Sequence, residues 1–218
     1  MATGLRPNLS FCRVGNEFVF LDIEKDRYFR LAGAAAADLA RFITVQEPQA
    51  CDFPALIKAD ILTAAERPTW ADWQHLPIAT QASSALRRGP TAIGEIAIAL
   101  MSEARVRRAL QRGKLQAIIS RLNEKQDRAR PLVEANDEKA HRIVRAFELA
   151  KFLRSPANLC LSRSIALTQR LRKVGCHANL VMGVRASPFA AHSWVQFGEI
   201  VLNDTCEEVV RFQPILVA

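Results

Sequence analysis

The segment between residues 155 and 175 constrains the fold most, because it marks both ends of a helix. Ser155–Pro156 or Asn158 can begin this helix, since proline suits the first helical position, and Gly175 can end it after a cationic last turn. Small and apolar side chains recur in it at helical spacing, namely Cys160, Ser164, Leu167 and Leu171. Cys160 therefore falls in the first turns, where unpaired N–H groups and the helix dipole favour a thiolate.

After this helix the apolar pattern changes to period two, which predicts strands. A first strand covers residues 178–184, and a second carries His192 and Trp194 on one face. A tight turn at Gly198 leads to a third short strand that ends just before Asp204. We expect an antiparallel meander in which His192 and Asp204 come from neighbouring strands.

Cys160, His192 and Asp204 together predict nucleophilic catalysis by a thiol. A carboxylate at Asp204 can accept one imidazole N–H and leave the other ring nitrogen facing the sulfur. Each residue also has a plain structural interpretation, because a cysteine on an apolar helix is a common core residue and an aspartate after a strand is a common turn former. The hypothesis therefore rests on the order cysteine, histidine, aspartate combined with helix, strand, strand.

The motifs Leu159–Leu161, Ala191–Val195 and Leu202–Thr205 carry these three residues. With them, residues 130–218 resemble the transglutaminase-like cysteine protease domain of lasso-peptide B proteins, the enzymes that remove the leader from a precursor peptide. The resemblance implies a transglutaminase-like or papain-like fold, with a catalytic helix packed on an antiparallel sheet. It also implies two partners: the precursor peptide, bound through its leader, and a separate ATP-dependent cyclase that closes the macrolactam.

The first part of the chain predicts a small winged-helix-like unit, with three strands followed by helices. The short runs expected as strands are residues 9–14, 17–22 and 27–31. Residues 34–43 predict an alanine-rich helix, and Asp52 can cap another that carries Phe53, Leu56, Ile57 and Leu62. A winged helix also suggests DNA binding as a function. Residues 1–80 hold 8 basic and 10 acidic side chains, and this net negative charge argues against DNA binding.

The motif from Asp26 to Gly33 has an acidic turn, an aromatic pair, a leucine and then a helix. It resembles the peptide-recognition element of pathways that modify ribosomally made peptides, related to the pyrroloquinoline-quinone peptide chaperone, over residues 5–65. The resemblance implies that a leader adds as a strand to the edge of the third strand, with the last helix as the other wall. The leader-binding residues it implies are Arg27, Tyr28, Phe29 and Arg30 on the strand and Phe53, Leu56 and Ile57 on the helix. Because strand residues alternate between faces, one of the aromatic pair is expected to fill the core instead.

Residues 66–92 are rich in proline and predict a linker, and three amphipathic helices follow it, starting near Thr91, Leu115 and Asp137. We therefore expect an α+β protein with two domains. Residues 1–80 form a leader-recognition domain, and residues 81–218 form a transglutaminase-like cysteine peptidase domain.

Charge and composition limit the classes of partner that the protein is expected to bind. The net charge of +8 arises in residues 81–218, where basic side chains are spread over helices among acidic ones and without interleaved aromatics. This pattern is typical of a solvated face and predicts no nucleic-acid binding. No stretch has the apolar length of a membrane span or a signal peptide, so we expect no membrane partner and a cytoplasmic protein.

The five cysteines are odd in number and contain no C-x-x-C pair, which predicts free thiols. Cys176, His177, His192 and Cys206 could be drawn as a zinc site, but they lack recognised ligand spacing. We expect no metal and no cofactor, and no Walker-type loop indicates ATP binding.

The predicted function is a cysteine peptidase that binds the leader of a precursor peptide and cleaves it from the core during lasso-peptide maturation. Two alternatives stay open. The chain could be a non-catalytic leader-binding scaffold for the cyclase, which a Cys160 buried away from His192 would favour. It could also be an acyltransferase with the same triad, since a thioester does not determine which nucleophile resolves it.

Overall fold

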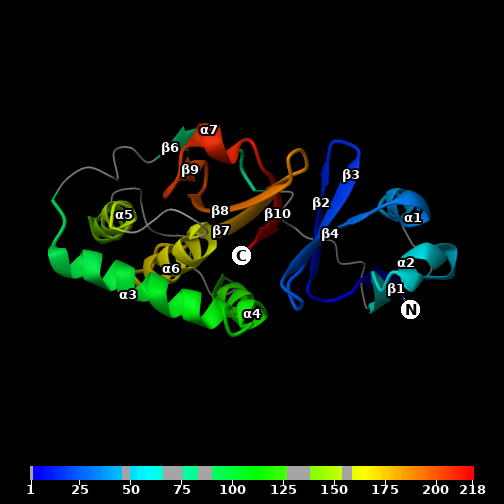
Figure 1. Ribbon diagram of the computed structural model, residues 1–218, viewed down its shortest axis with the longest axis horizontal. Coiled ribbons are helices and arrows are strands. Elements are labelled where there is room, and N and C mark those ends of the chain that lie inside the picture. The colour runs from blue at the N-terminus through cyan, green and yellow to red at the C-terminus, as the bar shows by residue number, and fades with distance from the viewer. Residues whose placement is uncertain (1, 46–49, 66–75, 83–89, 127–137, 154–158) are drawn as a thin grey trace.

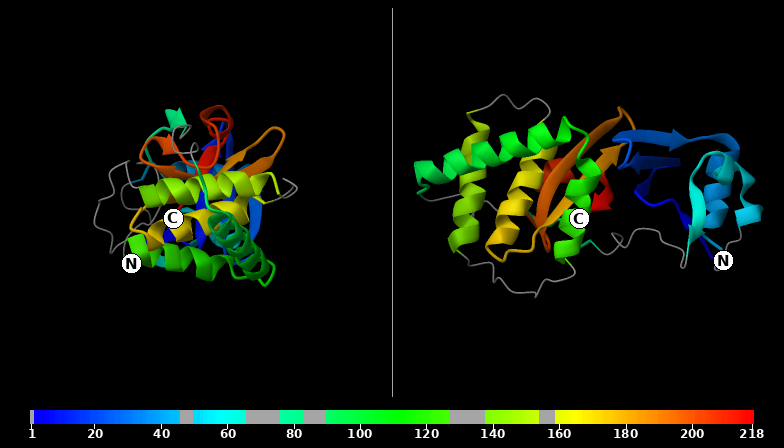
Figure 2. Two further views of the ribbon diagram at one scale, coloured as in Figure 1. Left: turned by 90° about the vertical axis from the view of Figure 1, so that its left-hand side faces the viewer. Right: turned by 90° about the horizontal axis from the view of Figure 1, so that it is seen from below.

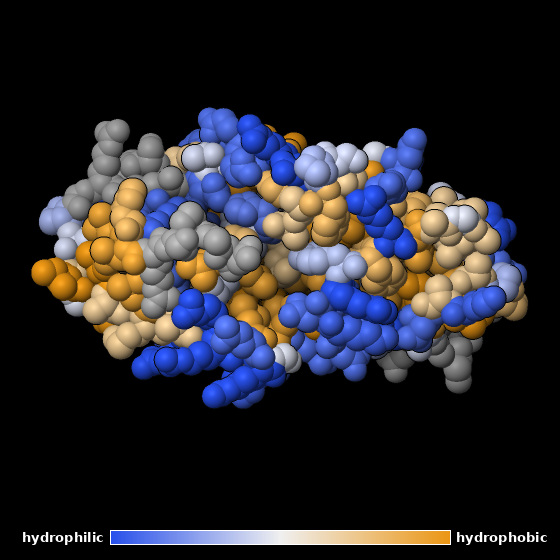
Figure 3. All heavy atoms as spheres, viewed as in Figure 1, coloured by the Kyte–Doolittle hydropathy of each residue, from blue (hydrophilic) through white to orange (hydrophobic). Residues whose placement is uncertain are grey.

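The computed structural model describes residues 2–45, 50–65, 76–82, 90–126, 138–153 and 159–218. The molecule is elongated, with the N-terminal strands and short helices at one end and the long helices at the other (Figures 1 and 2). Hydrophobic side chains gather on the surface at the end opposite the N-terminal strands, on the left in Figure 3, where the first long helix begins. In the described residues, no helix combines the length and apolarity that a bilayer span requires.

The three N-terminal strands are confirmed. They are β2 (Leu9–Val14), β3 (Glu17–Asp22) and β4 (Arg27–Leu31), which form an antiparallel sheet in the order β2-β3-β4. Gly15 opens the two-residue turn between β2 and β3 with a φ of 61°, a conformation that favours glycine. The predicted alanine-rich helix is α1 (Gly33–Phe42).

The second predicted helix of this part is much shorter than expected. A 3-10 turn η1 (Ala50–Asp52) leads into α2 (Pro54–Lys58), whose N-cap is Phe53 rather than Asp52. Asp60, with a φ of 57°, ends the turn after α2, so Leu62 lies on a strand and its placement on the helix was wrong. That strand is β5 (Leu62–Ala65), which pairs with β1 (Ala2–Leu5), and neither strand was predicted. The winged-helix-like assignment of this unit stays a prediction.

Both faces of the N-terminal sheet are buried. Phe20 packs on one face with Leu39, Phe42 and other residues of α1 and α2. Val19 and Leu21, which alternate with Phe20 on β3, pack on the other face into the core that contains the long helices. The sheet therefore belongs to two cores at once.

The helices expected from the amphipathic patterns are all present. They are α3 (Ile93–Leu110), α4 (Leu115–Gln126), α5 (Glu138–Lys151) and α6 (Cys160–Lys173). Gly175, with a φ of 87°, follows the end of α6. Helix α6 packs against two strands of a five-stranded sheet, and α3 and α5 pack against α6 (Figure 1).

The five-stranded sheet has the order β10-β7-β8-β9-β6. Its strands are β7 (Asn179–Arg185), β8 (Ala190–Phe197), β9 (Ile200–Val201), β10 (Gln213–Val217) and β6 (Gln81–Ala82). The expected meander β7-β8-β9 is antiparallel, whereas β6 runs parallel to β9. Strands β6 and β10 and the short helix α7 (Cys206–Val209) were not predicted.

The face of this sheet away from α6 carries a separate apolar cluster around Trp194, Val209 and Phe212. Leu76 and Ala79 pack against it, so the described end of the predicted linker contacts the second sheet. The division into domains at residue 80 stays a prediction.

The N-terminal sheet joins the rest of the molecule along β2 and β4. The Ser10 hydroxyl of β2 donates to the backbone oxygen of Ile215 in β10. The Arg30 guanidinium of β4 donates to the backbone oxygen of Ala186 over 2.9 Å, at the turn between β7 and β8.

We predict that Gly183→Ala destabilises the protein by about 1–3 kcal/mol, because overpacking forces neighbours out of place. A Cβ on Gly183 would lie 2.8 Å from Trp194 Cζ3 and 3.0 Å from Phe212 Cβ. Chemical denaturation measures the free energy of unfolding. Gly94→Ala is the control, since a Cβ there meets nothing within 4 Å and alanine suits a helix. Equal stabilities of Gly183→Ala and the wild type would contradict the tight packing.

Candidate active site

Cys160 is the first residue of α6, and Leu159 is its N-cap. The backbone N–H of Arg163 makes a 3.0 Å hydrogen bond to Leu159 O. The helix itself therefore leaves the N–H groups of Cys160, Leu161 and Ser162 without acceptors, as at any helix start. These N–H groups and the dipole of a 14-residue helix stabilise negative charge on the Cys160 sulfur.

His192 and Asp204 are directly paired. The distance from His192 Nε2 to Asp204 Oδ2 is 2.7 Å, and Asp204 Oδ1 also accepts the Thr205 N–H over 2.8 Å. The imidazole packs between aromatic rings, with centroids 6.2 Å from Trp194 and 5.1 Å from Phe212. With Nε2 bound to the carboxylate, Nδ1 is left for the thiol.

Cys160 and His192 shift each other's titration. Burial raises the pKa of the Cys160 thiol, but a hydrogen bond with His192 and the imidazolium charge bring it below its ordinary value. Burial lowers the pKa of His192, but hydrogen bonds with Asp204 and Cys160 raise it to about 9. For Asp204, burial raises the pKa and the hydrogen bond with His192 lowers it below its ordinary value. The two charged forms, thiolate and imidazolium, therefore stabilise each other.

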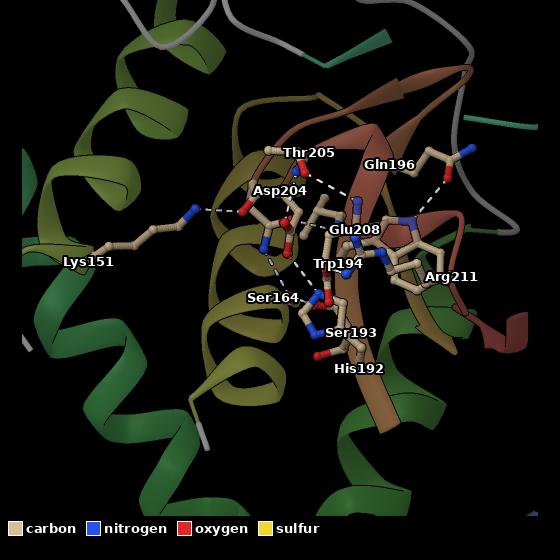
Figure 4. A network of polar contacts seen from close by, with 12 residues as sticks. Lys151, Ser164, His192, Ser193, Trp194, Gln196, Asp204, Thr205, Glu208 and Arg211 are labelled. Atoms are coloured by element: carbon tan, nitrogen blue, oxygen red, sulfur yellow. Dashed lines mark hydrogen bonds and ion pairs between the residues drawn. The ribbon is translucent and has the colours of Figure 1, made fainter. Parts of the chain in front are cut away.

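A buried polar network holds the segment that carries Asp204 (Figure 4). Ser164 of α6 donates its hydroxyl to the backbone oxygen of Ser193 over 2.9 Å and accepts the Asn203 side-chain N–H over 2.9 Å. Asn203 Oδ1 accepts the Val195 N–H over 2.8 Å. These bonds tie α6, β8 and the residue before Asp204 into one unit.

The segment is also held from α5, where Lys151 Nζ donates to the Asn203 backbone oxygen over 2.6 Å. The sequence interpretation missed the roles of Lys151, Ser164 and Asn203. Ser164 was visible on the Cys160 stripe and Asn203 next to Asp204, but neither pattern reveals which atoms they bind.

Ser193 adds a buried hydroxyl to the site, next to the Cys160 thiol. Its side chain is 3% exposed, and in the described parts of the chain its hydroxyl has no hydrogen-bond partner of normal geometry. It lies near enough to Cys160 to help lower the pKa of the thiol, after the larger effects of burial and His192.

The four strand residues expected to bind a leader lie on different faces of β4. Phe29 stacks on Phe20 with ring centroids 5.1 Å apart, and Arg27 lies over the Phe29 ring at 5.7 Å. Tyr28 and Arg30 face the other way, toward Phe189, at 5.7 and 5.6 Å.

The helix residues expected to bind a leader are also divided. Phe53 is 2% exposed and Leu56 is 0% exposed, so both fill the N-terminal core. Ile57 is 48% exposed and is available to a ligand.

The outer edge of β4 offers backbone groups. The two-residue turn at Gly15 makes Val14 and Glu17 a hydrogen-bonded pair, and bonded and non-bonded pairs then alternate through both ladders. Tyr28 and Arg30 therefore direct their N–H groups away from β3. Within the described residues, no strand pairs with this edge.

A hollow of about 260 Å³ adjoins β4. Arg27, Phe29 and Leu31 of β4 line it, with Ala59 to Ile61 of the segment after α2 opposite them. The predicted leader-binding strand thus borders both an open edge and a hollow.

The search for a metal site covered the described residues only, and no group of three or more His, Cys, Asp or Glu side chains in them could hold an ion. All five cysteines are free thiols, and Cys160 is half-buried.

Two comparisons with known proteins bear on the site. The pattern of the transglutaminase-like superfamily matches residues 100–217, which include the three candidate catalytic residues. Microcin J25-processing protein McjB of Escherichia coli is 49% identical over 45 residues. Those residues are 21% of this chain and 22% of McjB, so the chain matches about a fifth of the length of this curated relative. No solved structure matches the chain. The suspected relation to lasso-peptide B proteins is confirmed by the first two matches.

We predict that Asp204→Asn moves the alkylation of Cys160 by iodoacetamide to higher pH. The carboxylate raises the pKa of His192, so without it the imidazolium is lost at lower pH and the thiolate loses its partner. Because Cys51 is exposed and can react with iodoacetamide too, the rate of alkylation at Cys160 is followed by the mass of its peptide after digestion. Glu207→Gln, a change of an exposed carboxylate on α7, is the control. An unchanged midpoint in Asp204→Asn would remove Asp204 from the triad.

Proposed function

Because the chain belongs to the transglutaminase-like superfamily, we propose that it is a cysteine peptidase that removes the leader from a ribosomally made precursor peptide in lasso-peptide maturation. One observation carries this proposal: the Cys160 thiol at a helix start is paired with His192, whose Nε2 lies 2.7 Å from Asp204. The relation to lasso-peptide B proteins supplies the substrate class.

The geometry supports a two-step acyl transfer. The Cys160 sulfur attacks the scissile carbonyl carbon, a C–S bond forms, and the carbonyl electron pair moves to oxygen. When that pair returns, the C–N bond breaks and the leaving nitrogen takes the proton of His192, which leaves a thioester. Water then attacks the thioester as His192 takes its proton, and the acid and free thiol are released. The free N–H of Cys160 is a candidate donor to the oxyanion.

We propose that the leader binds as an added strand on the outer edge of β4. The outward N–H groups of Tyr28 and Arg30 supply main-chain donors, and the hollow beside Phe29 can take a leader side chain. Exposed Ile57 supports a contact from α2, while Phe53 and Leu56 support the groove from within.

The proposed partners are the leader of the precursor peptide and the ATP-dependent cyclase of the same pathway. The proposed place of action is the cytoplasm, where ribosomes make the precursor and thiols stay reduced. No nucleic acid, membrane or cofactor has a part in this proposal.

The first alternative, a non-catalytic scaffold, would be favoured by a Cys160 buried away from His192. Their mutual effect on titration, through a hydrogen bond, gives it no support. The second, an acyltransferase, shares every step up to the thioester and differs only in whether water or an amine resolves it.

We predict that Cys160→Ala abolishes leader removal, because the substitution removes the nucleophile of the proposed triad. Mass spectrometry of the precursor after incubation gives the result, and the partner cyclase with ATP is added in a parallel reaction. Cys206→Ala, a change of another half-buried thiol, should cleave at the wild-type rate. A product in which an amine is joined to the precursor, in place of two fragments, would support the acyltransferase. Normal cleavage by Cys160→Ala would contradict the mechanism with Cys160 as nucleophile.

We predict that Arg30→Pro weakens leader affinity at least tenfold, because proline removes an outward N–H donor and fixes φ. Titration of a fluorescent leader peptide measures the affinity. Arg30→Ala keeps the backbone donor and removes the side-chain contacts with Glu17 and Ala186, so it separates the two effects. If both variants bind the leader equally, the β4 edge is not the docking site.

A further inference from the structure

The tip of the hairpin formed by β7 and β8 lies against the N-terminal sheet (Figures 1 and 2). Arg30 of β4 donates to the Ala186 backbone oxygen over 2.9 Å, and its guanidinium lies 5.6 Å from the centre of the Phe189 ring. The Tyr28 ring meets the same Phe189 ring edge-on, with centroids 5.7 Å apart. Two side chains on one face of β4 therefore hold the hairpin tip.

This tip leads directly to the candidate catalytic histidine. Phe189 immediately precedes β8, and His192 is the third residue of that strand, so about 10 Å of extended chain separates the two. Across the hairpin, His192 pairs with Gly183 of β7. A displacement of the tip therefore reaches the backbone that carries the imidazole.

The segment of β8 around His192 has a partner strand on one side only. β7 pairs with residues 190–196, whereas β9 pairs with only the last two residues of β8. In the described residues, no other strand pairs with β8. The Ser164 hydroxyl anchors the strand one residue after His192, at the Ser193 backbone oxygen, and the contact at the tip anchors it three residues before.

The hairpin also contacts the imidazole through Phe212. Arg185, the last residue of β7, lies over the Phe212 ring at 5.5 Å, and that ring packs 5.1 Å from the His192 imidazole. Arg185 pairs with Ala190 next to the tip. The position of the tip therefore affects both the backbone of His192 and the ring that packs on its side chain.

The residues that hold the tip also border the proposed leader site. The N–H groups of Tyr28 and Arg30 point to the open edge of β4, while the side chains of the same two residues contact Phe189. A leader strand added at that edge would therefore fix the backbone of both residues that hold the hairpin.

We propose that Arg30 and Phe189 are positioning residues, whose contact fixes the hairpin tip and thereby the place of His192 beside the nucleophile. This inference deepens the proposed peptidase function and rests on it. Both side chains act through His192 rather than on the reacting atoms. A leader bound at β4 then orders the strand that places the catalytic base, so recognition and cleavage are physically linked.

The test uses the full chain and the alkylation of Cys160 by iodoacetamide, which needs no substrate. Phe189→Leu keeps an apolar side chain at a position that is 45% exposed, but it removes the ring that Tyr28 and Arg30 contact. The imidazolium then stabilises the thiolate less, so the midpoint of alkylation should rise by about one pH unit. A role in stability alone would lower the free energy of unfolding and leave this midpoint in place.

Three further variants separate the contact from other effects. Phe189→Tyr keeps the ring and should keep the wild-type midpoint, whereas Arg30→Ala should raise the midpoint as Phe189→Leu does. Arg13→Ala is the control, since it removes an exposed guanidinium of the same sheet that bonds to Gly15 in its own turn. Wild-type midpoints in both Phe189→Leu and Arg30→Ala would overturn the proposal.

The precursor assay distinguishes positioning from binding. Phe189→Leu should lower kcat about tenfold and leave the affinity for the fluorescent leader peptide unchanged, because misplacing a catalytic group by about 1 Å can cost about a hundredfold in rate. A loss of leader affinity that accounts for the whole loss of rate would overturn the positioning role.

The alkylation result is independent of the proposed function. If the wild type leaves the precursor intact while Phe189→Leu and Arg30→Ala raise the midpoint, the peptidase function fails and the positioning role stands. If the wild type cleaves the precursor and neither variant moves the midpoint, the positioning role fails and the peptidase function stands.

Discussion

The arrangement of the candidate site depends on the hydrogen bonds of the Ser164 hydroxyl. This hydroxyl is fully buried on α6, donates to the backbone of β8 at Ser193 and accepts a side-chain N–H from Asn203. Breaking one bond would leave the other group unpaired in the interior, which costs more than an average hydrogen bond contributes. The network therefore fixes the helix, the strand and the Asp204 segment in one relative position, and that position brings the candidate triad residues together.

Local patterns were enough to predict the elements whose partners lie close in sequence. The runs that became β2, β3 and β4 alternate and are joined by short turns, and α3 to α6 carry complete apolar stripes. Strands β1, β5, β6 and β10 were missed because their partners are distant: Ala2 pairs with Ala65, and Gln81 with Ile200. Such short strands acquire their conformation from the neighbour, which local propensity does not encode.

The candidate site also has a part that local patterns could predict and a part that they could not. Cys160, His192 and Asp204 could be found because each stands at a defined place in a helix or strand pattern, and the structure brings His192 to both of the others. The donors around them could not be found. Ser164 and Asn203 matter through the atoms that they bind, and those contacts exist only after side chains from separate elements have packed.

The N-terminal sheet has no free face, since Phe20 is buried on one side and Val19 and Leu21 on the other. A cut in the backbone between the sheet and α3 would therefore expose an apolar surface on both pieces, and each surface would remain the best cover for the other. We expect the two fragments to reassociate and complement each other when mixed, as halves of a reconstituted enzyme do. Covalent continuity would then raise their effective concentration without being required for their assembly.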